Sequence, residues 1–256
     1  LSVENILHLT SSEQVTLTDA QTDQDGAIYL YGTFKGNVSI GGFLGRSNGG
    51  SDLILIKISS SGKVEELKVF GGSDDEYSSS LALGLDQVFL SGSFLNQATF
   101  GSMSLKSKGH EDGFTLSLPS SDLSQLKWCQ SFGGTGVDRI EGLSVSTNQK
   151  LLVSGTFHGL IEIHDKQYDS GDGSGVFAVI LESGGELLST SAFLASGYVT
   201  NYISEWNPFD ESFLLAGDFV GTLVIDQTQV SSNGGKDIFV AKFSEDLTAE
   251  NLLSLG

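Results

Sequence analysis

The sequence predicts an all-β protein made of four similar antiparallel units, and three observations support this. A Gly-x-Phe tripeptide recurs at intervals of 60, 63 and 62 residues, starting at Gly32, Gly92, Gly155 and Gly217. Short runs of Ile, Val and Phe bounded by Gly and Ser are typical of strands. Helical periodicity never persists beyond about two turns. Because self-similarity at a fixed period is typical of repeat proteins, we expect a single domain over residues 1–256.

The second unit shows how each unit divides into strands. We expect its strands at 79–85, 87–94, 98–105, 113–118 and 126–132. Gly, Asn and Asp, which suit tight turns, lie between them. Pro119 begins a polar insertion, 119–124, that has the length of one helical turn. The nearly continuous apolar run 52–58 of the first unit predicts a strand that is covered on both faces.

The repeated residues are predicted to be structural. The Gly of Gly-x-Phe fits a position where another backbone approaches closely, and the Phe fits a repeated core position. Twenty residues after each of these glycines stands Asp52, Asp112, Gly175 or Asp237. An aspartate that follows a Gly-rich turn can accept hydrogen bonds from the amides of that turn, so we interpret it as a turn residue.

A family resemblance rests on the same residues. The chain contains Trp128-Cys-Gln-Ser-Phe-Gly-Gly134, then Asp138, then a strand that ends in Gly155-Thr-Phe157; Asp237-Ile-Phe-Val-Ala-Lys242 closes a later unit. This order resembles the bacterial SBBP-type β-propeller repeat. The resemblance implies four-stranded blades around an axis and a secreted or cell-surface protein, without implying any chemistry. The pattern is incomplete, because the third unit has Gly175 in the aspartate position and Phe193-Leu194-Ala195 in place of Phe-Gly-Gly.

The two ends of the sequence repeat each other. Residues 247–255 match residues 1–9, so one strand occurs five times and the others four times. We therefore expect a β-propeller of four blades with one redundant terminal strand, either closed as a ring or part of a larger array. Three explanations of the spare strand are open. The chain could be a segment of a longer array in which the terminal strand is included twice, or the spare strand could complete a blade in another chain, or it could cap an edge. Its candidate assembly residues are Leu1, Ile6, Leu7, Leu9, Leu252, Leu253 and Leu255.

Composition excludes several kinds of partner. The formal charge is −19, from 13 basic and 32 acidic residues, and no basic face is visible for binding nucleic acid. No apolar stretch is long enough for a transmembrane helix, so membrane insertion is not expected. The chain begins with Leu1, which suggests a mature or trimmed product.

Few residues suggest a specific site. The oxygen-rich, glycine-bent segment 169–175 makes Asp169 and Asp172 candidate calcium ligands, although an ordinary turn is the stronger interpretation. No other cofactor is expected. Asn37 begins the only Asn-x-Ser/Thr sequon and is a candidate glycosylation site. The aromatic residues that could stack on sugars from loops are Tyr77, Tyr168, Tyr198, Tyr202 and Trp206.

No catalytic constellation stands out, so we expect a protein that is not an enzyme. The preferred hypothesis is a structural or adhesive extracellular module that associates with itself or with other chains by strand pairing. The alternative is a glycan-binding propeller, with or without calcium. A glycosidase or lyase on the same scaffold is the third possibility.

Overall fold

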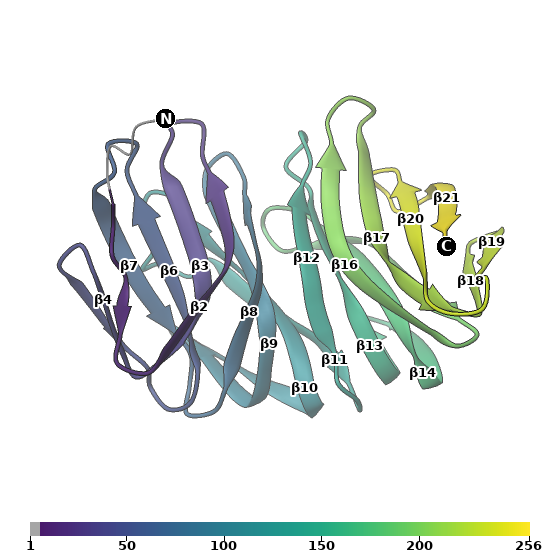
Figure 1. Cartoon of the computed structure of the whole chain (residues 1–256), viewed down its shortest axis with the longest axis horizontal. Helices are drawn as coiled ribbons and strands as arrows, with labels where there is room; N and C mark the ends of the chain where they lie inside the picture. Colours follow the sequence, from purple (N-terminus) through teal and green to yellow (C-terminus); the bar gives the residue numbers. More distant parts are fainter. Residues whose placement is uncertain (1–5) are drawn as a thin grey trace.

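The computed structural model describes residues 6–256 and confirms an antiparallel all-β fold without helices in this part of the chain (Figure 1). Within the same residues, no helix has the length and apolar character needed to cross a membrane.

Consecutive strands pair into four antiparallel units of four strands each. Unit 1 contains β2 (Gln14–Thr22), β3 (Ile28–Lys35), β6 (Asp52–Ile58) and β7 (Val64–Phe70). Unit 2 contains β8 (Glu76–Leu83), β9 (Gln87–Phe100), β10 (Met103–Pro119) and β11 (Trp128–Gly134). Unit 3 contains β12 (Arg139–Val145), β13 (Leu151–Ile163), β14 (Lys166–Leu181) and β15 (Leu187–Ala195). Unit 4 contains β16 (Tyr198–Asn207), β17 (Ser212–Val220), β20 (Asp237–Phe243) and β21 (Ala249–Leu255).

Each unit also carries a hairpin between its second and third strands. In units 1 and 4 the hairpin has its own strands, β4 (Asn37–Ile40) with β5 (Phe43–Arg46) and β18 (Thr222–Ile225) with β19 (Thr228–Ser231). In units 2 and 3 the long strands β9, β10, β13 and β14 run on into the hairpin. The predicted separate strand 98–105 was therefore wrong, because these residues form the end of β9, a turn and the start of β10. The suggested helical turn at 119–124 is also wrong, since hydrogen-bonded turns occupy that segment.

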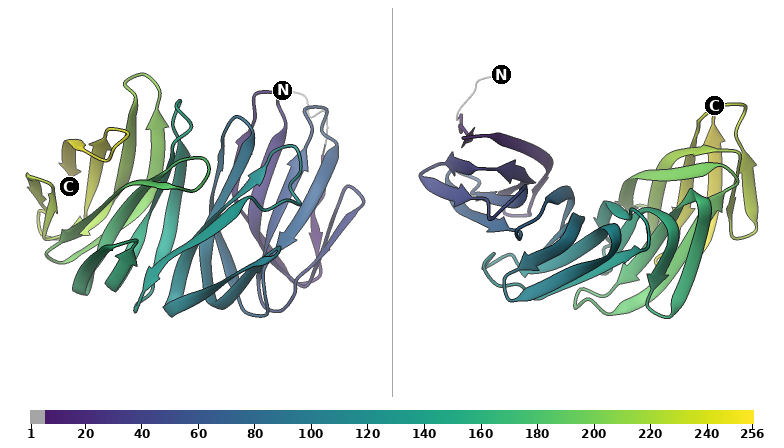
Figure 2. Two further views of the ribbon diagram at one scale, coloured as in Figure 1. Left: turned by 180° about the vertical axis from the view of Figure 1, so that it is seen from behind. Right: turned by 90° about the horizontal axis from the view of Figure 1, so that it is seen from below.

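The units lie side by side in an arc (Figures 1 and 2). The first strand of each unit, here called the inner strand, contacts the inner strand of the next unit: β2 with β8, β8 with β12 and β12 with β16. Units 1 and 4 lie at opposite ends of the arc, and the sheets do not close on each other (Figure 2). The expected alternative of a closed four-blade ring is thus wrong for this chain.

Neighbouring units are joined at what we call junctions, where the hairpin of one unit meets the fourth, outer strand of the preceding unit. Gly133 pairs with Glu162 at the second junction, and Leu194 pairs with Val224 at the third. At the first junction, Gly71 N donates to Thr99 O (3.3 Å). The pairs at the second and third junctions connect units 2 and 3 and the unit 4 hairpin into one ten-stranded sheet, so the four-stranded blades that the resemblance implies are not separate sheets here.

Apolar clusters fill the spaces between units. The four Phe side chains of Gly-x-Phe, at positions 34, 94, 157 and 219, are fully buried, as predicted. Phe94 and Phe114 pack between units 1 and 2, Phe157 and Phe177 between units 2 and 3, and Phe219 and Phe239 between units 3 and 4.

The two copies of the terminal strand have different partners. The C-terminal copy, β21, pairs with β20 of its own unit. At the N-terminal end, Thr10 and Ser11 (β1) pair with Ser39 and Val38 of β4, as the end of an outer strand does at each junction. The rest of the N-terminal copy is unpaired between Ile6 and Leu9, and Leu1 lies outside the described residues.

Candidate functional site

All four inner strands bulge at the same position of the repeat. The register with the second strand skips one residue in each unit: Thr18, Ser79, Glu141 and Tyr202. A β-bulge leaves its extra residue unpaired and redirects its side chain. The scaffold therefore presents four side chains of different chemistry from four equivalent positions.

The repeated glycine explains how the bulge fits. A Cβ on Gly32 would overlap the carbonyl oxygen of Thr16, and a Cβ on Gly155 would overlap that of Arg139. The glycines at positions 92 and 217 face inner-strand carbonyls in the same way. This close backbone approach confirms the structural role predicted for the Gly of Gly-x-Phe.

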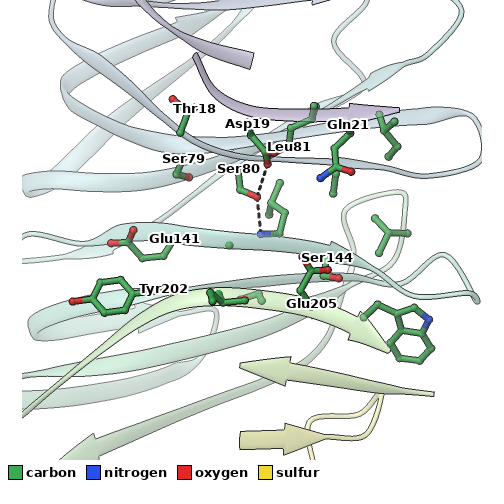
Figure 3. A pocket seen from close by; sticks show the side chains of 18 of the residues that line it. Thr18, Asp19, Gln21, Ser79, Ser80, Leu81, Glu141, Ser144, Tyr202 and Glu205 are labelled. Atoms are coloured by element: carbon green, nitrogen blue, oxygen red, sulfur yellow. Dashed lines mark hydrogen bonds between the residues drawn. The ribbon is translucent and has the colours of Figure 1, made fainter. Parts of the chain in front are cut away.

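The bulges open into a groove of about 550 Å³ formed by the inner strands of all four units (Figure 3). Its lining is mostly polar. The lining side chains that can hydrogen-bond include Thr18, Asp19, Gln21, Ser79, Ser80, Glu141, Ser144, Tyr202 and Glu205. Such a surface can exchange hydrogen bonds with a hydroxyl-rich ligand.

Two of these side chains are already engaged between units. Asp19 Oδ2 accepts a hydrogen bond from Leu81 N (2.8 Å), and Ser80 Oγ accepts one from Leu143 N (3.2 Å). Both satisfy the backbone amide of the neighbouring inner strand, and Figure 3 shows them on the wall of the groove. They are therefore structural, whereas the bulge side chains Glu141 and Tyr202 have surfaces facing the groove.

A charged pair lies between units 2 and 3, in a hollow that adjoins the groove. Arg139 donates from Nε to Glu111 Oε1 (3.0 Å) and from Nη2 to Glu111 Oε2 (2.6 Å). Glu141 lies beside this pair in the same hollow of about 400 Å³, which Tyr77 also lines. Burial raises the pKa of Glu141, while Arg139 opposes the shift. The arrangement places a carboxyl group of raised pKa beside the Glu111–Arg139 pair.

Two aromatic residues of β16 complete the groove. Tyr202 and Trp206 both line it, separated by four residues along the strand or about 13 Å. Trp206 is held by Phe213, whose ring centroid is 4.8 Å away, and donates from Nε1 to Thr147 Oγ1 (3.0 Å). Of the other aromatic candidates, Tyr77 lines the adjoining hollow, Tyr168 packs against the core and Tyr198 lies under the Lys236 ammonium group.

The predicted calcium ligands lie away from the groove. Asp169 and Asp172 are exposed on β14, where residues 170–173 interrupt the pairing with β13, and Asp169 Oδ1 accepts from Gly171 N (2.8 Å). Among residues 6–256, no three His, Cys, Asp or Glu side chains gather as a metal site would require. The calcium assignment stays a prediction. Asn37 is exposed at the start of β4, so the glycosylation prediction also stands untested.

Buried carboxylates occupy the first two junctions. Asp52 accepts from Asn48 N (2.9 Å) and Asp112 from Lys108 N (3.0 Å), as predicted for the turn aspartate. A second acid stands beside each: Glu76 accepts from Gly72 N and Asp138 from Gly134 N. Burial raises the pKa of Asp52 to about 6, that of Asp138 to about 6 and that of Glu76 to about 8.

Sequence reasoning singled out Tyr202 and Trp206 but missed Glu141, Arg139 and the bulges. The sequence signal for the bulges was the glycine of Gly-x-Phe. A glycine is needed at this position because the backbone of the bulged inner strand comes too close for a Cβ atom. No protein-family model matches the chain, and no curated protein matches it either.

Proposed function

We propose that this chain is a non-catalytic module of an extracellular or cell-surface protein, with propeller-type blades, that binds an oligosaccharide in the inner-strand groove. The observation that carries the proposal is the set of four equivalent bulges, which direct Thr18, Ser79, Glu141 and Tyr202 toward one groove. A repeated backbone with varied side chains suits a binding surface built on a structural scaffold.

The propeller interpretation is supported by the order and placement of the strands. Each unit is an antiparallel meander whose first strand lies nearest its neighbours, and the arc brings the inner strands together (Figure 2). Blades of a propeller are arranged in this way around an axis. The resemblance to SBBP-type repeats points in the same direction.

The chemistry of the groove favours a neutral or cationic oligosaccharide. Serine, threonine and tyrosine hydroxyls can exchange hydrogen bonds with sugar hydroxyls, and Tyr202 offers an exposed ring for stacking. Asp19, Glu141 and Glu205 make the groove acidic, and the chain carries a charge of −19. An anionic polysaccharide would be repelled by this field.

Glycan-array screening followed by calorimetric titration tests the proposal. We expect binding of neutral or amino sugars, a loss of at least tenfold in affinity for Tyr202→Ala, and a smaller loss for Glu141→Gln. Phe43→Ala and Glu162→Gln are the matched controls, because both residues lie in hairpins outside the groove. A separate titration with Ca²⁺ alone, for the unmodified chain and for Asp169→Ala, tests the predicted calcium ligands, which lie away from the groove. Absence of glycan binding, or hydrolysis of the bound sugar, would contradict the proposal.

A further inference from the structure

The last unit exposes an apolar face that is buried in the earlier units. Ile238 of β20 is 50% exposed, whereas the equivalent residues Leu53 and Val176 are fully buried against the next unit. Leu255 of β21 is 61% exposed, while its equivalents Phe132 and Phe193 are 3% exposed. Leu253 is also exposed on β21. We call Ile238, Leu253 and Leu255 the end face of unit 4.

The first unit leaves the complementary face partly uncovered. Ile28 of β3 is 38% exposed, although its equivalents Val88, Leu151 and Phe213 are fully buried by the preceding unit. Leu44 of β5 is also exposed. The two faces that meet at every internal junction are thus both present, and both incompletely covered, on a single chain.

Charge favours contact between the same two ends. Unit 1 with its loops (12–72) has five basic and seven acidic residues, whereas unit 4 (196–256) has two basic and nine acidic residues. The fourth unit is the most acidic part of the array and the first is the least acidic. Contact between unit 4 and unit 1 is therefore less repulsive than contact between two copies of unit 4.

We propose that the end face of unit 4 binds unit 1 of a second copy of this chain, in the arrangement of the internal junctions. The contact is heterologous, so its repetition gives a ring or an open filament according to the rotation between copies. It uses different residues from the groove and is independent of sugar binding.

The duplicated terminal strand gives this contact a specific feature. Thr10 and Ser11 lie against β4 where Gly133 and Gly134 lie against β13. In unit 4, Gly256 corresponds to Gly133 and Leu255 to Phe132, so Gly256 is the equivalent of Thr10. In the assembled pair, Gly256 of the incoming chain and Thr10 of the resident chain compete for the same position at the edge of β4. Removal of residues 1–11 is therefore expected to tighten the association.

Sedimentation velocity from micromolar to millimolar concentration tests this contact. We expect concentration-dependent association of the unmodified chain, and association at least tenfold weaker for Ile238→Glu, because a charge is buried in an apolar contact. Leu188→Glu is the matched control, since Leu188 is similarly exposed but lies on β15 of unit 3. Circular dichroism establishes that each variant is folded.

Three results would overturn the proposal. The first is a chain that stays monomeric at millimolar concentration, which would leave the face to a different partner. The second is an Ile238→Glu variant that associates as tightly as the unmodified chain. The third is weaker association after removal of residues 1–11, which would indicate donation of that strand to another copy.

Discussion

Gly175 and Leu194 share one space at the third junction, where glycine stands at the first position and the larger residue at the second. At the second junction the larger residue stands at the first position and glycine at the second. A Cβ on Gly175 would lie 2.6 Å from Leu194 Cδ2. At the second junction the equivalent residues are Asp112 and Gly133, and there a Cβ on Gly133 would overlap the Asp112 carboxyl group. The second acid changes as well, from Asp138 to Val199. The third junction thus lacks the aspartate, the glycine and the second acid of the second junction. The space left by the missing aspartate is filled by Leu194, so a polar junction has become an apolar one.

This compensation predicts strong coupling between positions 112 and 133. Gly133→Leu alone is expected to lower the free energy of unfolding by about 3 kcal/mol, because the added side chain overpacks the site and displaces a buried carboxylate. The double variant Asp112→Gly with Gly133→Leu copies the third junction and should recover at least half of that loss. A double-mutant cycle by urea denaturation measures the coupling. Purely additive effects would show that the two positions do not share the space.

The buried acids of the first junction predict a pH dependence of stability. Burial raises the folded-state pKa of Glu76 to about 8 and that of Asp52 to about 6. Since these values exceed the unfolded ones, the folded state binds more protons, and this contribution to stability is complete at low pH. It is lost as pH rises from about 4.5 to about 8 for Glu76.

Glu76→Gln separates this contribution from other titrations. The variant should match the unmodified chain near pH 5 and be more stable than it above pH 8, because glutamine keeps a neutral group beside Asp52. The midpoint of urea unfolding across this pH range is the measurement. Parallel pH profiles for the two proteins would show that Glu76 is already ionised in the folded state.

The bulge explains why the Gly-x-Phe glycine is needed. Gly155→Ala places a methyl group against the Arg139 carbonyl, so it is expected to lower the free energy of unfolding by about 2–3 kcal/mol. Gly235→Ala is the control, because nothing lies within 4 Å of a Cβ at that position. Thermal denaturation of both variants provides the comparison, and equal stabilities would contradict the close approach at Gly155.

The sequence predicted the elements that repeat and missed those that depend on how units pack. Gly155, Phe157 and Asp112 recur at fixed spacing, so their roles at a close approach, in the core and in a turn followed from the pattern. The bulge residues Glu141 and Tyr202 do not resemble each other, so only the glycine opposite each bulge recurs in the sequence. Curvature of the arc depends on the contacts between units, which is why an open arc could not be distinguished from a closed ring.

The last prediction concerns Asp19 and the connection between units 1 and 2. The Asp19 carboxylate accepts from the amide of Leu81 (2.8 Å), an inner-strand group that faces the neighbouring unit. Asp19→Ala leaves this amide without its partner and should cost about 1–2 kcal/mol of unfolding free energy. Hydrogen exchange at Leu81 should become faster in this variant, whereas Asp165→Ala, in the exposed hairpin turn of unit 3, should leave it unchanged. Unchanged exchange in Asp19→Ala would mean that the contact between inner strands protects the amide without the carboxylate.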